Sequence, residues 1–241
     1  MRIVAEFEPV ICVLTPWRAV EATHRVATMV LVDSLAEQAI LERELDDSKP
    51  ARADQQPGLH WLIFTPFRYP PLPSGSRFRG PGQHGVFYGA DSRKTACVEL
   101  GYWRWRFLMD SPNLVTLDPM PQTLFQSEIR GLSIDLRAGK WASRENDWMH
   151  PVGYAPTQEI ARQARKNDIQ VIRYASVRDP ERGACAAILN PIAFSKNEPV
   201  SQEGWMLSVS TTNVFWKSNS VFGEESFEFK TVQWRMGKSL E

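Results

Sequence analysis

The residues best suited to chemistry lie in one segment rich in arginine and glycine and directly after it. They are Arg68, Arg77, Arg79, Tyr88 and Glu99. Arginines in such a loop suit a pyrophosphate, a tyrosine offers a flat surface to a planar ring, and a carboxylate stabilises a developing positive charge. Cleavage of an N-glycosidic bond in a dinucleotide needs these three kinds of group.

Each of these residues also has an ordinary structural explanation. The arginines could be solvated loop charges, Tyr88 could be a core aromatic with a satisfied hydroxyl, and Glu99 could lie on the surface of a helix. Glu99 is the hardest to explain in this way, because the apolar runs TACV and LGYW flank it. A carboxylate in such surroundings needs a partner.

The elements that would position these residues follow from the local sequence. Proline, glycine and arginine crowd residues 68–85, so this stretch is predicted to be a loop. Residues 85–90, GVFYGA, predict a strand. The next residues predict a helix that begins at a cap on Asp91 or Ser92 and carries Glu99 in its middle. The predicted order is therefore loop, strand, helix.

The N-terminal part is predicted to be helical. Thr15 and Pro16 suit a helix cap and a first helical position, and apolar residues recur over 17–45, which predicts one long helix or two joined ones. Residues 46–58 are polar and contain two prolines, so they predict a loop. Residues 60–67, HWLIFTPF, are a short apolar run that predicts a buried strand.

The downstream sequence predicts mainly strands. Short strands are expected at 114–119, 131–136, 169–177 and 184–191. Residues 156–168 predict a helix with Thr157 as its cap. From residue 204 onward, apolar and polar residues alternate as in an antiparallel sheet.

Helices early and strands late predict an α+β fold. We expect a mixed or antiparallel β core with flanking helices and a long N-terminal helical segment. In domain terms, residues 1–58 would form a helical segment packed on a core of residues 59–241, within a single globular unit.

Composition limits the classes of partner. The chain has 28 basic and 28 acidic residues, so no overall field steers it to nucleic acid or to an anionic membrane. Its three cysteines are odd in number and widely spaced among apolar neighbours, which indicates a reducing cytoplasm. The histidines show no metal-ligand spacing with them, and apolar runs are far short of the roughly 20 residues that span a bilayer. We expect a cytoplasmic protein with no metal.

Two blocks of the sequence resemble the RES-domain toxin family. SGSRFRGPGQHGVFYGADSRKTACVELGYWR is similar to its signature of an arginine in a glycine-rich loop, a tyrosine on a strand and a glutamate on a helix, and Tyr88 and Glu99 have the expected spacing. YAPTQEIARQARKNDIQVIRYASVRDPERGACAAILNP is similar to its second block, with Ser176 at the position of its serine. The FRYPP segment also resembles longer members, at Arg68 and Tyr69.

The resemblance implies a toxin of a toxin–antitoxin pair, with a fold similar to the diphtheria-toxin-like ADP-ribosyltransferases. Such a toxin uses NAD⁺ as co-substrate and cleaves its nicotinamide–ribose bond. The ADP-ribose would pass to a protein such as phosphoribosyl pyrophosphate synthetase, or to phosphate or water, and growth would stop. A cognate antitoxin would cover the active site.

The resemblance also implies roles for four catalytic residues. Arg77 would contact the pyrophosphate, Tyr88 would pack on nicotinamide or its ribose, Glu99 would stabilise the ribosyl cation, and Ser176 would hydrogen-bond near the ribose.

Three further residues, Arg68, Tyr69 and Arg79, are candidates for NAD⁺ binding. Arg79 is an alternative to Arg77 at the pyrophosphate, because the loop is one residue longer than in short members of the family. Two other classes of function stay open from the residues alone. One is a module that binds a nucleotide or an antitoxin without catalysis, and the other is a nucleic-acid binder that uses the WRWR stretch at Trp103–Arg106.

Overall fold

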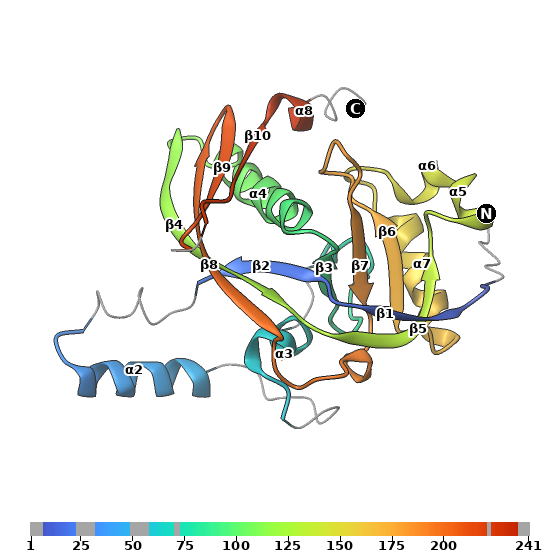
Figure 1. Ribbon diagram of the computed structural model, residues 1–241, viewed down its shortest axis with the longest axis horizontal. Helices are drawn as coiled ribbons and strands as arrows, with labels where there is room; N and C mark the ends of the chain where they lie inside the picture. Colours follow the sequence, from blue (N-terminus) through green and yellow to red (C-terminus); the bar gives the residue numbers. More distant parts are fainter. Residues whose placement is uncertain (1–6, 23–31, 49–57, 70–72, 221–222, 236–241) are drawn as a thin grey trace.

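The chain folds around one ten-stranded sheet (Figure 1). The computed structural model describes residues 7–22, 32–48, 58–69, 73–220 and 223–235. Within them the strands are β1 (Val10–Leu14), β2 (Trp17–Glu21), β3 (Phe87–Ala90), β4 (Thr116–Gln126), β5 (Ile129–Asp135), β6 (Val171–Ala175), β7 (Ala184–Ile188), β8 (Ser201–Ser210), β9 (Asn213–Ser218) and β10 (Ser226–Lys230). Their order in the sheet is β1-β5-β6-β7-β3-β2-β4-β8-β9-β10. Neighbouring strands run antiparallel except β5 and β6, which are parallel.

Helices cover both faces of this sheet. The described helices are α2 (Leu35–Asp47), α3 (Trp61–Arg68), α4 (Arg93–Met109), α5 (Gly139–Ala142), α6 (Glu145–Trp148), α7 (Ala155–Lys166) and α8 (Val232–Arg235), with a 3-10 turn η1 (Pro191–Ala193). Helices α4 and α7 pack on the larger core, whereas α3 packs on the smaller core of the opposite face (Figure 1). Strand alternation separates the two cores: on β3, Phe87 belongs to the α3 side and Tyr88 packs on the α4 side.

The predicted α+β class is confirmed by this mixed, mostly antiparallel sheet with flanking helices. The strand at β3, the helices α4 and α7 and the antiparallel C-terminal strands lie where the sequence predicted them. Ser92 caps α4, because its hydroxyl oxygen accepts a hydrogen bond from the backbone nitrogen of Thr95 at 3.1 Å. Thr157 does not cap α7. It is buried inside the first turn, and its hydroxyl donates to the carbonyl of Tyr154.

The long N-terminal helix predicted over residues 17–45 is wrong. Residues from Trp17 to Glu21 form β2, which pairs along its whole length with β4 and touches β3 at Ala90. A strand forms here because its backbone groups complete the ladder at the centre of the sheet, and this tertiary pairing outweighs the local helical pattern. Helix is retained in α2, and residues 23–31 lie outside the described part. The boundary expected at residue 58 stays a prediction.

The strand predicted over residues 60–67 is also wrong, because these residues belong to α3. Its start is fixed by His60, whose Nδ1 accepts from the backbone nitrogen of Leu62 at 3.3 Å. The consecutive apolar residues Leu62, Ile63 and Phe64 are buried in the smaller core. A short apolar run is compatible with a strand or a buried helix, so its periodicity could not decide between them.

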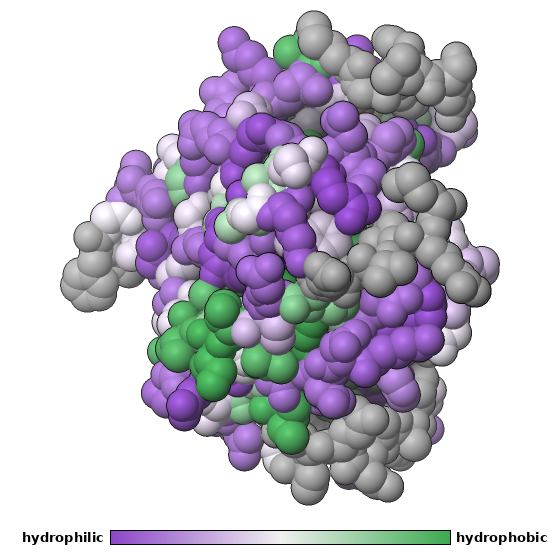
Figure 2. Space-filling model, turned by 90° about the vertical axis from the view of Figure 1, so that its right-hand side faces the viewer, coloured by the Kyte–Doolittle hydropathy of each residue, from purple (hydrophilic) through white to green (hydrophobic). Residues whose placement is uncertain are grey.

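The end of the molecule that carries β1 has an apolar patch in an otherwise mainly hydrophilic surface (Figure 2). Strand β1 is an edge strand of the described sheet, and it exposes Val10, Ile11 and Val13 by 61%, 66% and 69%. None of these side chains lines the cavity described next.

Candidate active site

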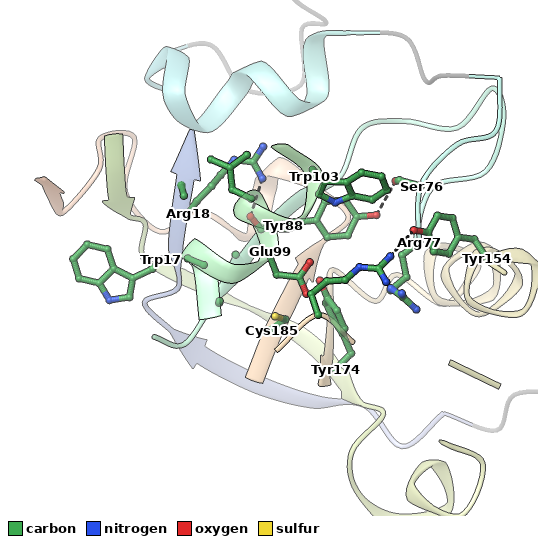
Figure 3. Close-up of a pocket in the computed structure, with 16 residues that line it drawn as sticks. Trp17, Arg18, Ser76, Arg77, Tyr88, Glu99, Trp103, Tyr154, Tyr174 and Cys185 are labelled. Carbon is green, nitrogen blue, oxygen red and sulfur yellow. Dashed lines mark hydrogen bonds between the residues drawn. The ribbon is translucent and has the colours of Figure 1, made fainter. Parts of the chain in front are cut away.

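An open cavity of about 850 Å³, its mouth included, lies on the α4 side of the sheet (Figure 3). It forms where β2 and β3, helix α4, the start of α7 and the loop before β3 meet. Its polar wall consists of Arg18, Ser76, Arg77, Tyr88, Glu99, Tyr154, Tyr174 and Arg178. Among the described residues, this wall contains three arginines and one carboxylate, so the cavity favours an anionic ligand.

Glu99 projects into this cavity from the middle of α4 (Figure 3). Its Oε1 accepts a hydrogen bond from the hydroxyl of Ser176 at 2.5 Å. The surrounding protein desolvates the carboxyl group and thereby raises its pKa, while the Ser176 hydrogen bond and the charges of Arg178 and Arg77 oppose this shift. The carboxylate is therefore poorly hydrated, and its charge acts strongly on a neighbouring cation.

Ser176 lies behind Glu99, at the start of the connection between β6 and β7. It is fully buried and does not line the cavity. Its Oγ accepts hydrogen bonds from the backbone nitrogens of Arg178 at 3.1 Å and Asp179 at 3.0 Å. A hydroxyl has one donor and two acceptor positions, so all three are used once it donates to Glu99.

Tyr88 ties strand β3 to the arginine loop. Its hydroxyl lies 2.8 Å from Ser76 Oγ and accepts from the backbone nitrogen of Phe78 at 2.9 Å (Figure 3). Burial raises the pKa of Tyr88, so the phenol is neutral at pH 7. The ring forms part of the cavity wall beside Glu99.

Arg77 is directed into the cavity by a tight turn. The backbones of Ser76 and Arg79 pair with each other through bonds of 2.7 and 3.1 Å. Gly75 has a φ of +68°, and a Cβ there would lie 2.0 Å from the Arg79 carbonyl oxygen, so this position requires glycine. Gln158 of α7 donates from Nε2 to the carbonyls of Ser74 and Ser76, both at 3.1 Å, and holds the turn against α7.

The other three sequence candidates lie outside the cavity wall. Arg79 turns away from it and donates to the carbonyls of Tyr69 at 2.6 Å and Gln83 at 3.2 Å. Arg68 ends α3, and Tyr69 follows it with 40% of its surface exposed. The structure thus brings together Arg77, Tyr88 and Glu99, with Ser176 behind them.

Several cavity residues were not singled out from the sequence. They are Trp17, Arg18, Tyr154, Tyr174 and Arg178, whereas Trp103 was considered only as part of a stretch that could bind nucleic acid. Arg18 donates from Nη1 to the Tyr88 carbonyl at 2.7 Å, and burial lowers its pKa to about 10. The segment that contains Arg18 was predicted to be helical, so no feature of the sequence indicated that Arg18 lines this cavity. Tyr154 and Arg178 lie inside the second block of the sequence resemblance, and Arg178 is two residues after Ser176. This block is the sequence feature that could have identified both residues as candidates.

No group of three or more histidine, cysteine, aspartate or glutamate side chains in the described part of the chain could hold a metal ion. None of the helices described is both long and apolar enough to cross a bilayer.

Comparison with known proteins identifies the family. The family model of the RES domain matches residues 49–210, which are 162 of the 241 residues. The chain belongs to the RES domain family, as the sequence motifs predicted.

Among solved structures, the chain is similar to one from the crystal structure of the M. tuberculosis MbcT–MbcA toxin–antitoxin complex. The two share 11% sequence identity with a TM-score of 0.46, and the similarity covers 96% of this chain and 92% of that one. No curated protein sequence matches the chain.

Proposed function

We propose that this cavity binds NAD⁺ and cleaves the bond between nicotinamide and ribose. The observation that carries the proposal is the position of Glu99, a desolvated carboxylate in the wall of a cavity that also contains Arg77 and Tyr88. Membership of the RES domain family supports it.

The proposed reaction needs little acid–base chemistry from the protein. The bond between ribose C1′ and nicotinamide N1 breaks, and its electron pair goes to the nitrogen, so nicotinamide leaves as a neutral molecule without receiving a proton. The positive charge left on the ribose is stabilised by the Glu99 carboxylate. An acceptor then forms a bond to C1′ through a lone pair, and a water or protein acceptor passes its proton to the solvent. Positioning and electrostatics therefore supply most of the rate acceleration.

The remaining residues have supporting roles in this proposal. Arg77 binds the pyrophosphate, and the ring of Tyr88 packs on nicotinamide or its ribose. Ser176 holds the Glu99 carboxylate in one orientation, a role favoured over contact with the ribose because its hydroxyl has no free donor or acceptor position. Arg79 fixes the loop rather than the substrate, since it turns to the Tyr69 carbonyl.

We further propose that the protein is the toxin of a toxin–antitoxin pair. Depletion of NAD⁺, or transfer of ADP-ribose to a protein such as phosphoribosyl pyrophosphate synthetase, would stop growth. The acceptor is a protein, phosphate or water. A cognate antitoxin would inhibit by covering the cavity mouth.

The test is release of nicotinamide from NAD⁺ by the purified full chain, freed of any antitoxin, with phosphate or with a cell lysate. NAD⁺ labelled in the adenylate part then traces the ADP-ribose to a protein band or to a small product. A protein that releases no nicotinamide under either condition would rule out the proposal. Induction of the chain in cells, with Glu99→Gln as the control, tests whether growth arrest needs the chemistry.

A further inference from the structure

Three arginine residues in the described part of the chain have less than a tenth of their surface exposed. Arg77 and Arg173 are 8% exposed and Arg178 is 5% exposed. Arg173 has an acidic partner, since its Nη2 lies 2.6 Å from Asp91 Oδ2. Arg77 and Arg178 form no salt bridge with a carboxylate of the described residues, and the partners that hold them are carbonyls, a hydroxyl and aromatic rings. Both charges act through space on the Glu99 carboxylate and lower its pKa, but one carboxylate cannot neutralise two buried cations.

Both unpaired guanidinium groups contact one side chain, that of Tyr154. The Arg77 guanidinium lies over the Tyr154 ring, 5.1 Å from its centroid, and Arg178 Nη2 donates to the Tyr154 hydroxyl at 3.3 Å. Figure 3 shows Arg77 and Tyr154 side by side at the cavity. All three residues line it. Two like charges are therefore held close together, an arrangement that an anion between them would stabilise.

The position of Arg178 is fixed before any ligand arrives. Its Nη2 donates to the Pro151 carbonyl at 2.5 Å, and its guanidinium stacks on the Tyr102 ring, 3.9 Å from the centroid. Arg77 is held in the same way by the Trp148 carbonyl, at 2.8 Å from Nη1. Donors that are already ordered lose little entropy on binding.

We propose that Arg77 and Arg178, joined through Tyr154, form a two-guanidinium site for a diphosphate. Two planar guanidinium groups match two phosphoryl groups, each with one negative charge and several acceptor oxygens. The other charged groups among the described wall residues are Glu99 and Arg18, one of each sign, so the cavity keeps a net positive charge. The identity of the ligand as the diphosphate of NAD⁺ rests on the proposed function, whereas the affinity for a diphosphate does not.

The experiment measures binding of inorganic pyrophosphate to the full chain by calorimetry. A Glu99→Gln background removes the catalytic carboxylate, and adenosine serves as an uncharged comparison. The variants are Arg77→Gln, Arg178→Gln, Arg178→Lys and Tyr154→Phe. Arg162→Gln is the matched control, because Arg162 is an α7 arginine whose partner is the neighbouring Glu159.

Arg77→Gln and Arg178→Gln should each weaken pyrophosphate binding on the order of tenfold or more, because each removes a charge-assisted pair of hydrogen bonds. Arg178→Lys should weaken it less, and Arg162→Gln should leave it unchanged. The affinity for adenosine should be the same in the parent and in all of these variants. If parent protein does not bind pyrophosphate, or if a folded Arg178→Gln variant binds it as tightly as the parent, the two-arginine site is wrong.

Stability is measured for each variant, because Arg178 is buried. If Arg178→Gln does not fold, the pyrophosphate affinities of Arg178→Lys and Tyr154→Phe are compared with that of the parent instead. Parental affinity in both variants would overturn the two-arginine site. The same experiments distinguish failure of the two-arginine site from failure of the proposed function. Suppose that pyrophosphate binding needs both arginines, but the protein that retains Glu99 releases no nicotinamide. This result would support the two-arginine site and reject NAD⁺ cleavage. Nicotinamide release with an unchanged KM in Arg178→Gln rejects the site alone.

Discussion

The hydroxyl of Ser176 lies 2.5 Å from Oε1 of Glu99, although the two residues are 77 positions apart in the chain. The backbone nitrogens of Arg178 and Asp179 fill the acceptor positions of this hydroxyl, so its proton is directed at the carboxylate. The relationship joins helix α4 to the connection between β6 and β7. It orients the Glu99 carboxylate in the cavity wall through an uncharged donor.

Glu99→Gln should lower kcat for nicotinamide release on the order of 10²- to 10³-fold, because the variant keeps the shape of the side chain but removes the charge that stabilises the ribosyl cation. KM should change little. Glu228→Gln, at an exposed position on β10, is the matched control and should be fully active. A Glu99→Gln variant with parental kcat would show that the carboxylate has no catalytic role.

The same substitution should stabilise the protein at neutral pH. Burial raises the pKa of Glu99 above its ordinary value, so the folded state binds this proton more tightly than the unfolded state does. The stability from this group is present at low pH and is lost as pH rises through the raised pKa. Melting temperatures of parent and variant should therefore diverge as pH increases from the acidic range to neutrality. Curves that stay parallel would contradict the raised pKa.

Ser176→Ala should move the acid limb of the kcat–pH profile to higher pH. The Ser176 hydrogen bond lowers the pKa of Glu99, so its loss raises that pKa further. Two buried backbone N–H groups also lose their acceptor, at a cost of about 1–3 kcal/mol each in the free energy of unfolding. Ser143→Ala, at an exposed hydroxyl, controls for the substitution itself. A purely structural role for Ser176 would lower stability but leave the profile in place.

Arg77→Ala and Arg79→Ala should separate the two loop arginines. Arg77 lines the cavity, so its loss should raise KM for NAD⁺ roughly tenfold or more while kcat changes less. Arg79 donates to the Tyr69 and Gln83 carbonyls outside the wall, so its loss should act through loop stability and change KM less. Initial rates over a range of NAD⁺ concentrations check both. Equal effects of the two substitutions on KM would argue against Arg77 as the pyrophosphate ligand.

The parts of the site that could be predicted from the sequence are those with a local signature. Tyr88 lies on a strand and Glu99 lies on the helix that follows it. The N-cap residue Ser92 allowed the start of this helix to be predicted. The relative orientation of their two side chains is set by this short strand–helix unit. Ser176 was placed by the second block of the family resemblance, but its three-way hydrogen bonding needs the folded chain.

The remaining parts depend on long-range pairing that has no local pattern. Arg18 reaches the cavity only because β2 lies between β3 and β4 in the sheet, and nothing in residues 17–21 specifies those neighbours. Tyr154 and Arg178 meet through side chains 24 positions apart. The buried helix α3 was mistaken for a strand because both bury a short apolar run equally well.

The place of β2 also bears on how the protein is made. This strand comes early in the chain but pairs with β4, which in turn pairs with β8, so the centre of the sheet joins segments far apart in sequence. Such non-local pairing is slow to form and waits for its later strands. A nascent chain that ends before Ser176 also lacks the hydroxyl that holds Glu99. The ribosome must therefore have produced most of the polypeptide before the cavity can assemble, which delays its activity until after synthesis of the core.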